Sequence, residues 1–313
     1  MKAIHLLSAT LLILTAISCN KAPTEPPRFA TDEVYVAIDE TFKPIMQEEV
    51  FVFNAQHTTT NIHTTYTTET EAINLLLKDS IRLIVATRPL SESETKTIKR
   101  HKLNPRQQII GYDALALIVN RNNPDTAITL AEVKRVMQGE LRRWEQLGKA
   151  TTKGDIQVVF DNQSSSTVRY VRDSLNGGAP LGKHLTALKS NQEVIDFIKD
   201  NPRSIGVVGA DWVKNPKDTS KISFDPSIRV MLVSRGGEGA EYVRPYQYHI
   251  ATGSYPLVRS VWMILTDPMS SSMTRNFFQF VGGNDGQLIL VKNSQLLPKM
   301  PVQVKDVNNR KGK

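Results

Sequence analysis

The chain has 313 residues, of which 40% are hydrophobic and 22% are charged, with a formal net charge of +8 and a pI of about 9.4. This is the composition of a globular protein, and its length leaves room for two ordinary domains. Lys and Arg form no run with interleaved aromatic residues, so a nucleic-acid surface is not expected; the richest basic segment, NNRKGK, belongs to a predicted tail over residues 303–313. A basic protein still favours anionic ligands.

The N-terminus predicts export and a membrane anchor. Residues 1–18 have the form of a signal peptide, with Lys2 before the apolar run LLSATLLILTAI and Ser18 as the small residue at the end. The run is too short to cross a bilayer as a helix. Cys19 is the only cysteine, so it has no disulfide partner, and AISC resembles the lipobox of bacterial lipoproteins.

A diacylated Cys19 would hold the mature protein on a bacterial membrane, facing the periplasm. The alternative is an ordinary signal peptide with a chance cysteine. Residues 19–31 contain three prolines and no apolar periodicity, so they are predicted to form a tether between the anchor and the folded part.

From residue 34 onward, short β-rich runs alternate with helical stretches, which predicts parallel strands covered by helices. In the first part of the chain we expect the strand VYVAI, a helix from Thr41, the extended run NIHTTYTT, the helix EAINLLLKD, the strand IRLIVAT and the helix SESETKTIKRH. The longer extended segment QQIIGYDALALIVNR follows.

The second part continues the alternation. It is predicted to contain the helix TLAEVKRVMQG, the strand IQVVF, a helix from Thr167, the helix SNQEVIDFIKD, the strands SIGVVG, IRVMLVS and VRSVWMILT, and the closing helices PMSSSMTRNFFQFV and GQLILVKN. Thr129 to Glu132 and Ser190 to Glu193 each have the spacing of a capping box, which supports helix starts there.

These runs are too many for one sheet, so the predicted fold is α/β with two lobes. The lobes would be joined by two crossing strands at a hinge, Ile109–Asn120 and Tyr248–Leu265. Lobe I would then be discontinuous, over 32–115 and 250–302, and lobe II, over 116–249, would be an insertion. Ligands of open α/β sheets lie beyond the carboxyl ends of the strands, so the site is expected in the cleft between the lobes.

Three predicted strand-to-helix turns are rich in hydroxyl groups: Asp39–Phe42, Tyr66–Thr70 and Asp161–Thr167. A helix N-terminus offers free N–H groups and a partial positive charge, and hydroxyl donors beside it complete an anion cradle. Helix capping is the alternative use of the same side chains. The four consecutive hydroxyls of SSST exceed what one cap needs.

The fragments TF, ATRPLSESE, GYDALALIVNRNNP, RRWEQLG, SSST, SIGVVG and YPLVRSVWMI occur in an order that resembles the phosphate-binding proteins of ABC transporters, from about Val34 to Pro298. These are type II periplasmic binding proteins. The resemblance implies that phosphate is held between the lobes and passed to the permease subunits of an importer. It implies a phosphate site made of Thr41, Phe42, Thr68, Thr70, Ser165, Ser166 and Thr167.

Two charged positions depart from the pattern of that family. Arg88 stands in Ala86-Thr87-Arg88, where the family commonly has an acidic residue, and Asp161 stands four residues before Ser165, where it usually has arginine. We therefore predict that Arg88 supplies the cation and that Asp161 accepts a proton of hydrogen phosphate. The alternative is that both are surface residues or that they pair with each other across the cleft.

Other chemistry has little support in the sequence. The six histidines lack metal-ligand spacing, so neither a metal nor another cofactor is predicted, and no G-x-S-x-G motif is present. The main prediction is a binding protein without enzymatic activity. Three alternatives remain: a protein for another oxyanion such as sulfate or molybdate, a lipoprotein that signals when its ligand binds, and a secreted hydrolase that uses Ser165 or Ser166.

Overall fold

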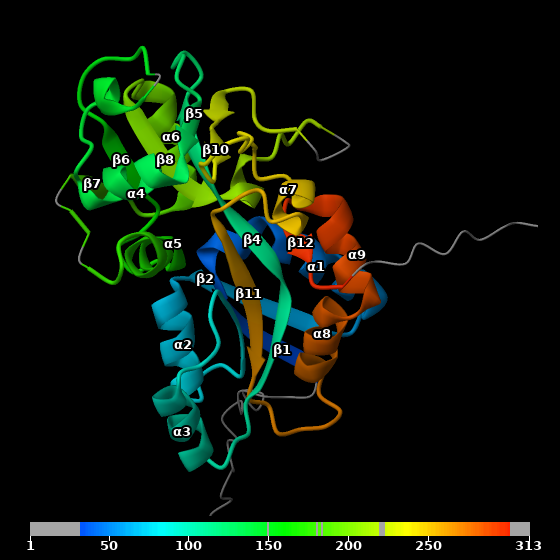
Figure 1. Cartoon of the computed structure of the whole chain (residues 1–313). Coiled ribbons are helices and arrows are strands. Elements are labelled where there is room, and N and C mark those ends of the chain that lie inside the picture. The colour runs from blue at the N-terminus through cyan, green and yellow to red at the C-terminus, as the bar shows by residue number, and fades with distance from the viewer. Residues whose placement is uncertain (1–31, 149, 180, 183, 219–222, 301–313) are drawn as a thin grey trace, which may run out of the picture.

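The structure is a computed structural model that describes residues 32–300 except 149, 180, 183 and 219–222 (Figure 1). The predicted signal peptide, Cys19, the tether through residue 31 and the tail at 303–313 lie outside the described residues. Within the described part of the chain, no helix has the length and apolar character needed to traverse a membrane.

The first lobe is built on a mixed sheet whose strands run in the order β2-β1-β3-β11-β4. The first three strands are parallel, whereas β11 is antiparallel to both of its neighbours. The strands are β1 (Glu33–Asp39), β2 (Asn61–Thr67), β3 (Leu83–Ala86), β4 (Arg106–Asn120) and β11 (Val258–Leu265), with the short β12 (Leu297–Pro298) beside β4.

Helices cover both faces of this sheet (Figure 1). On one face, α1 (Lys43–Gln56), α8 (Met273–Gly282) and α9 (Asn284–Asn293) bury a cluster that includes Phe53 and Phe277. On the other face, α2 (Glu69–Leu77) and α3 (Glu92–Arg100) bury a cluster that includes Ile73 and Ile98. The inner parallel strands β1 and β3 are therefore covered on both sides, which is why VYVAI and LIVA are short continuous apolar runs, whereas the edge strand β2 is mostly polar.

The second lobe has one core cluster, which extends from Ala114 to Leu257 and encloses Trp144 completely. Its sheet continues from β4 through β8, β6 and β7, with β9 also on β4, and β5 pairs separately with β10. The strands are β5 (Ala127–Thr129), β6 (Gln157–Phe160), β7 (Leu185–Ala187), β8 (Ser204–Gly209), β9 (Ile228–Val230) and β10 (Leu232–Ser234). The helices are α4 (Leu130–Gln138), α5 (Ser166–Tyr170), α6 (Asn191–Asp200) and α7 (Gln247–Ala251), with short turns η1 (Glu40–Phe42), η2 (Trp144–Gln146), η3 (Val171–Leu175) and η4 (Ala210–Val213).

One strand, β4, passes through both lobes, as Figure 1 shows. Its first half pairs with β11 and its second half with β8 and β9. The return crossing differs from the prediction, because Tyr248 lies in α7 and β11 begins only at Val258. Gly253, with φ +69°, lies in the turn that follows α7, and the chain then comes back beside β4, where the Leu115 N–H donates to Leu257 O.

Most local predictions from the sequence are confirmed, with three differences. The predicted helix PMSSSMTRNFFQFV begins only at Met273, because Ser272 caps α8 by accepting from the Arg275 N–H. The predicted strand IRVMLVS is two strands, because Met231 between them donates its N–H to Leu117 O while β10 turns to β5. The box at Thr129 and Glu132 is complete, whereas Ser190 only caps Glu193, whose carboxylate accepts from the Lys189 N–H instead.

Candidate functional site

The three hydroxyl-rich turns meet where the lobes face each other. Each begins its helix with a local cap: Asp39 accepts from the Thr41 N–H at 2.9 Å, Thr68 from the Glu71 N–H at 3.3 Å, and Ser165 from the Val168 N–H at 3.1 Å. A cavity of about 220 Å³ lies between them, lined by Asp39, Glu40, Tyr66, Thr67, Thr68, Asp161, Asn162, Ser165 and Lys189. The cleft predicted from strand order is therefore present as a polar cavity.

Arg259 is the buried cation behind this cavity. It lies in β11 directly opposite Asp113 of β4, and its Nε donates to Asp113 Oδ2 at 2.9 Å. Its Nη1 donates to the Ser166 hydroxyl at 2.9 Å, and the guanidinium carbon lies 5.6 Å from the centre of the Phe42 ring. The crossing strands thus hold the guanidinium against the start of α5.

Four buried polar atoms around this arginine have no hydrogen-bond partner among the described residues: Asp39 Oδ2, Thr41 Oγ1, Thr167 Oγ1 and Arg259 Nη2. Such atoms are rare in folded proteins, because each one left unpaired in the interior costs about 1–3 kcal/mol. Two hydroxyls and one guanidinium nitrogen can donate, and one carboxylate oxygen can accept. Asp39 lines the cavity, whereas Thr41, Thr167 and Arg259 are buried behind its lining residues. A ligand that accepts several hydrogen bonds and donates at least one suits the chemistry of this set.

The carboxyl groups of the site are held at unusual pKa values. Burial raises the pKa of Asp161 to about 7, partly offset by the Ser165 hydroxyl, which donates to Asp161 Oδ1 at 2.7 Å. Burial likewise raises the pKa of Asp39, and it raises that of Asp113 to about 6, in both cases against the opposing effect of Arg259. Burial alone would lower the pKa of Arg259, but these carboxylates outweigh it and raise that pKa, so the arginine stays charged.

The structure brings most of the predicted site residues together. Thr68, Asp161 and Ser165 line the cavity, Ser166 bonds to Arg259, and Thr41 and Thr167 carry unpaired hydroxyls. Phe42 is buried beneath the guanidinium. Thr70 is the exception within the second turn, because its side chain points to the other lobe, with Oγ1 at 3.5 Å from Ser164 O.

The prediction for Arg88 needs correction. Its guanidinium donates to both carboxylate oxygens of Glu94, at 2.8 and 2.7 Å, and to Pro89 O, so it belongs to the start of α3. It is not among the residues that line the cavity, and it does not pair with Asp161. The hydrogen bond from Arg88 is the main reason that the pKa of the Glu94 carboxyl is lowered to about 2, so the two side chains form an ion pair.

Sequence reasoning missed Arg259, Asp113 and Asp39 as site residues. A signal was present, because VRSVWMI and GYDALALIV each contain one charged residue within a strand that is otherwise largely apolar. Opposite charges in two buried strands predict a pair across a sheet, and the structure has Arg259 and Asp113 in register. The Asp39 carboxylate caps the Thr41 N–H with one of its oxygens, and the other oxygen has no partner among the described residues.

The hydrolase alternative finds no support in the contacts of the two serines. In the part of the chain that the structure describes, the Ser165 hydroxyl bonds to Asp161 and the Val168 N–H, and the Ser166 hydroxyl bonds to Arg259. Neither has the histidine that would activate a serine nucleophile. Among the described residues, no group of three or more His, Cys, Asp or Glu side chains is arranged to hold a metal ion.

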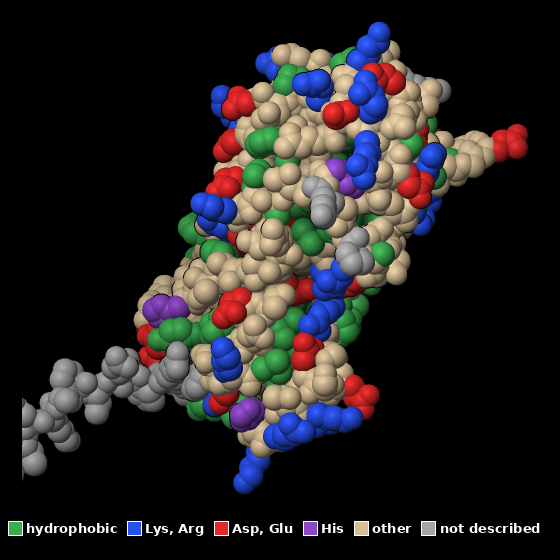
Figure 2. All heavy atoms as spheres, turned by 90° about the vertical axis from the view of Figure 1, so that its left-hand side faces the viewer, with side chains coloured by type: hydrophobic (Ala, Val, Ile, Leu, Met, Phe, Trp, Pro, Cys, Tyr) green, Lys and Arg blue, Asp and Glu red, His purple; other side chains and the backbone are tan. Residues whose placement is uncertain are grey.

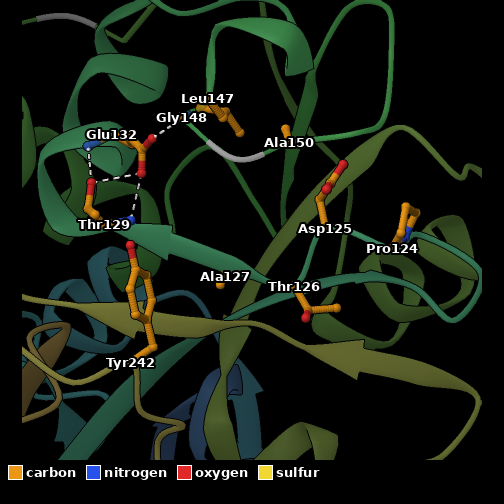
Figure 3. A pocket seen from close by; sticks show the side chains of 10 residues that line it. All are labelled: Pro124, Asp125, Thr126, Ala127, Thr129, Glu132, Leu147, Gly148, Ala150 and Tyr242. Carbon is orange, nitrogen blue, oxygen red and sulfur yellow. Dashed lines mark hydrogen bonds between the residues drawn. The ribbon is translucent and has the colours of Figure 1, made fainter.

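A larger cavity, of about 550 Å³, lies within the second lobe (Figure 3). Its acidic side chains accept hydrogen bonds from the backbone. Glu132 accepts from the N–H groups of Gly148 and Thr129, and Asp125 accepts from those of Thr151 and Thr152. Lys and Arg are absent from the described residues that line it. The buried cation Arg259 and the unpaired donors instead lie with the hydroxyl-rich turns, so the smaller cavity between the lobes is the candidate site.

An ion pair joins the lobes beside the site. Arg169 of α5 donates from Nε to Glu69 Oε2 at 2.5 Å and from Nη2 to Thr87 Oγ1 at 2.6 Å. Glu69 is buried at the start of α2 and also accepts from the Thr87 N–H and hydroxyl at 2.6 and 2.7 Å. Burial works to raise the pKa of Glu69, but Arg169 and Thr87 outweigh it and lower that pKa, so the carboxylate is ionised.

Replacing Arg169 with Met should therefore destabilise the protein at neutral pH, because the buried Glu69 carboxylate loses its counter-charge. We expect a loss of about 2 kcal/mol in the free energy of unfolding, below the usual range for a fully buried pair because Arg169 is 27% exposed. Urea denaturation measures this loss of stability. The matched control is Arg172→Met, which removes an exposed arginine paired with Asp173 and should change stability little. Equal losses in the two variants would contradict the role of Arg169.

The positive charge of the chain is not gathered into one region on the face that carries α2, α3 and α5. Figure 2 shows Lys and Arg side chains interspersed with Asp and Glu over both lobes there. Any attraction for an anion on this side is therefore carried by buried groups such as Arg259 rather than by a basic surface.

Comparisons with known proteins agree with this geometry. The PBP superfamily domain matches residues 23–284. The chain is 22% identical over 259 residues to the phosphate-binding protein PstS of Borreliella burgdorferi, covering 80% of this chain and 84% of that protein.

Solved structures give the same result. The chain resembles a putative phosphate ABC transporter substrate-binding protein with bound phosphate from Clostridium perfringens, with a TM-score of 0.69 and 19% identity over 86% of this chain and all of the other. It also resembles an ABC-type phosphate transport receptor from Vibrio cholerae, with a TM-score of 0.63 and 22% identity, covering 85% and 100%. The predicted resemblance and the type II two-lobe fold are confirmed.

Proposed function

Because the chain belongs to the PBP superfamily, we propose that it is an extracytoplasmic binding protein that captures inorganic phosphate between its lobes and delivers it to an ABC importer. The observation that carries the proposal is the set of unpaired buried atoms on Asp39, Thr41, Thr167 and Arg259. Three of them donate and one accepts, which suits a protonated oxyanion. Sulfate at neutral pH has no proton for the acceptor.

Calorimetric titration of the mature chain tests this proposal. Phosphate, arsenate, sulfate and molybdate are each titrated at one pH and one salt concentration. Phosphate should bind most tightly and arsenate next, because both carry O–H groups and have the same shape, whereas sulfate should bind at least about a hundredfold more weakly. A preference for sulfate or molybdate would support the alternative oxyanion specificity, and no heat with any of the four anions would overturn the proposal.

The proposal includes the lipid anchor on Cys19, which rests on the sequence alone. The unpaired cysteine follows the small residue Ser18 at the end of the apolar run, as in a lipobox. Replacing Cys19 with Ala should release the protein from the membrane fraction or leave its signal peptide uncleaved. Cell fractionation and the mass of the N-terminus measure both results. Normal processing with unchanged membrane retention would show that Cys19 carries no anchor.

A further inference from the structure

The cavity between the lobes is unusual for an anion site because acids outnumber bases on its walls. Asp39, Glu40 and Asp161 line it, and Lys189 is the one basic residue among the described lining residues. Arg259 lies behind the wall, but its charge is already shared with the buried Asp113 at 2.9 Å. If all these carboxyl groups were ionised, the cavity would repel a dianion.

The free acceptor positions can be identified atom by atom. Glu40 Oε2 accepts from Asn191 Nδ2 at 2.5 Å, and Glu40 is only partly buried, so the two buried aspartates are the stronger candidates for contact with a desolvated ligand. Asp161 Oδ1 accepts from the Ser165 hydroxyl, and its Oδ2 has only a weak contact of 3.4 Å with the same Asn191 amide. Asp39 Oδ1 accepts from the Thr41 N–H, and its Oδ2 has no partner among the described residues. One oxygen of Asp39 and one of Asp161 are therefore available to a ligand.

Charged and titratable groups face these two carboxyls from several elements. Asp39 experiences Arg259 of β11, Glu69 of α2 and the Ser166 hydroxyl of α5, and Asp161 experiences Asp39 and Arg259. The other ionisable groups around the cavity are Glu40, Tyr66 and Lys189 on its wall, Lys43 beside Glu40, and Asp113 and Tyr170 beside Arg259. Arg259 is the one cation that acts on both aspartates among these interactions.

We propose that bound phosphate makes one P–O–H···O contact to Asp39 Oδ2 and another to Asp161 Oδ2, so that the complex holds two protons between the ligand and these carboxylates. This deepens the proposed function and depends on it. Two oxygens that both carry negative charge cannot approach to hydrogen-bond distance, so each such contact needs one proton, whichever oxygen it formally belongs to. The ligand class is thus a protonated oxyanion such as phosphate, which can supply one or both of these protons.

The consequence is a dependence of affinity on pH. At pH 8 free phosphate is mostly hydrogen phosphate, which brings one proton, whereas the complex needs two. Since burial already raises the pKa of both carboxyls, the second proton can be held between a phosphate oxygen and the carboxylate of Asp39 or Asp161. Binding should then take up about one proton, and the dissociation constant should rise about tenfold between pH 7.5 and 8.5. A site with one aspartate acceptor would take up none.

The test is calorimetric titration of the mature chain with inorganic phosphate at pH 8, in two buffers of different ionisation heat, which gives the protons taken up per phosphate. Asp39→Asn keeps the Oδ1 acceptor for the Thr41 N–H and replaces Oδ2 by a donor, so uptake should fall to about zero and the pH dependence should flatten. The matched control, Glu71→Gln, removes an exposed charge on α2 and should leave uptake at about one.

Each result has a distinct meaning. Phosphate binding without proton uptake in the unmodified chain would overturn the two-proton complex and leave the proposed function intact. Uptake of about one proton that persists in Asp39→Asn would also overturn it, because Asp39 would not be the acceptor. An absence of phosphate binding at every pH from 6 to 8.5 would instead refute the proposed function. If Asp39→Asn does not fold, the uptake measured for the unmodified chain decides.

Discussion

Replacing Arg259 with Met should weaken phosphate binding on the order of a thousandfold, the largest effect expected of any single change. Arg259 is the buried cation of the site, its Nη1 donates to the Ser166 hydroxyl, and its Nη2 is an unpaired donor. A neutral side chain leaves an anion facing Asp39 and Asp161 without the buried cation that offsets their charge, and only the exposed Lys189 remains among the described lining residues. Titration with phosphate at pH 7 measures the loss.

The same change should also destabilise the fold, because it leaves the buried Asp113 without its partner, at a cost of about 3–5 kcal/mol. The double variant Arg259→Met with Asp113→Asn removes both charges and should recover most of that stability without recovering binding. Arg88→Ala is the matched control for the loss of an arginine, since Arg88 pairs with Glu94. If Arg88→Ala abolished binding and Arg259→Met did not, the assignment of the cation would be wrong.

Replacing Asp161 with Asn should narrow the preference for phosphate over sulfate from about a thousandfold to tenfold or less. Phosphate and sulfate have nearly the same shape, so hydroxyls and a guanidinium distinguish them poorly. A carboxylate accepts a proton from phosphate, whereas sulfate would place lone pairs against a buried negative charge. The Asn amide can donate to either anion. Paired titrations of the variant and the unmodified chain with both anions give the two ratios, and an unchanged ratio would show that specificity is set elsewhere.

The pH dependence of the stability of Asp161→Asn tests whether Asp161 is buried with a raised pKa in the unmodified chain. Burial raises the pKa of Asp161 from 3.8 to about 7, so the folded state binds this proton more tightly than the unfolded state does. The resulting contribution to the free energy of unfolding is complete below the unfolded-state pKa and is lost as the pH rises through the folded-state pKa. Asparagine does not ionise. The melting temperature of Asp161→Asn, relative to that of the unmodified chain, should therefore rise between pH 4 and pH 8. A difference in melting temperature that stays constant over this range would mean that Asp161 is not buried as a neutral acid.

Much of the fold could be predicted from local patterns, because its helices and strands carry strong signals of their own. The capping box at Thr129 and the apolar run of β8 determine their elements without help from the rest of the chain. The return crossing could not be predicted in this way. The residues from Tyr248 to Val258 form a short helix and a turn, and their course depends on contacts with β4 that have no local signature.

The hydroxyl residues of the candidate site were predicted because a helix start is recognisable in sequence. The charges were harder, because the partner of a charge is set by the fold. Arg88 looked suitable from its position after β3, but Glu94 in the following helix takes both of its donor groups. Arg259 lies in a strand that was predicted, but its role follows only from the register that places it opposite Asp113.

A crystal structure of the mature chain with phosphate is the measurement that tests the account most directly. We expect the phosphate oxygens within hydrogen-bond distance of Arg259 Nη2, Thr41 Oγ1 and Thr167 Oγ1, with two of them also close to Asp39 Oδ2 and Asp161 Oδ2. Phosphate bound instead at Arg88, or in the cavity of the second lobe beside Glu132, would contradict the site assigned to these residues.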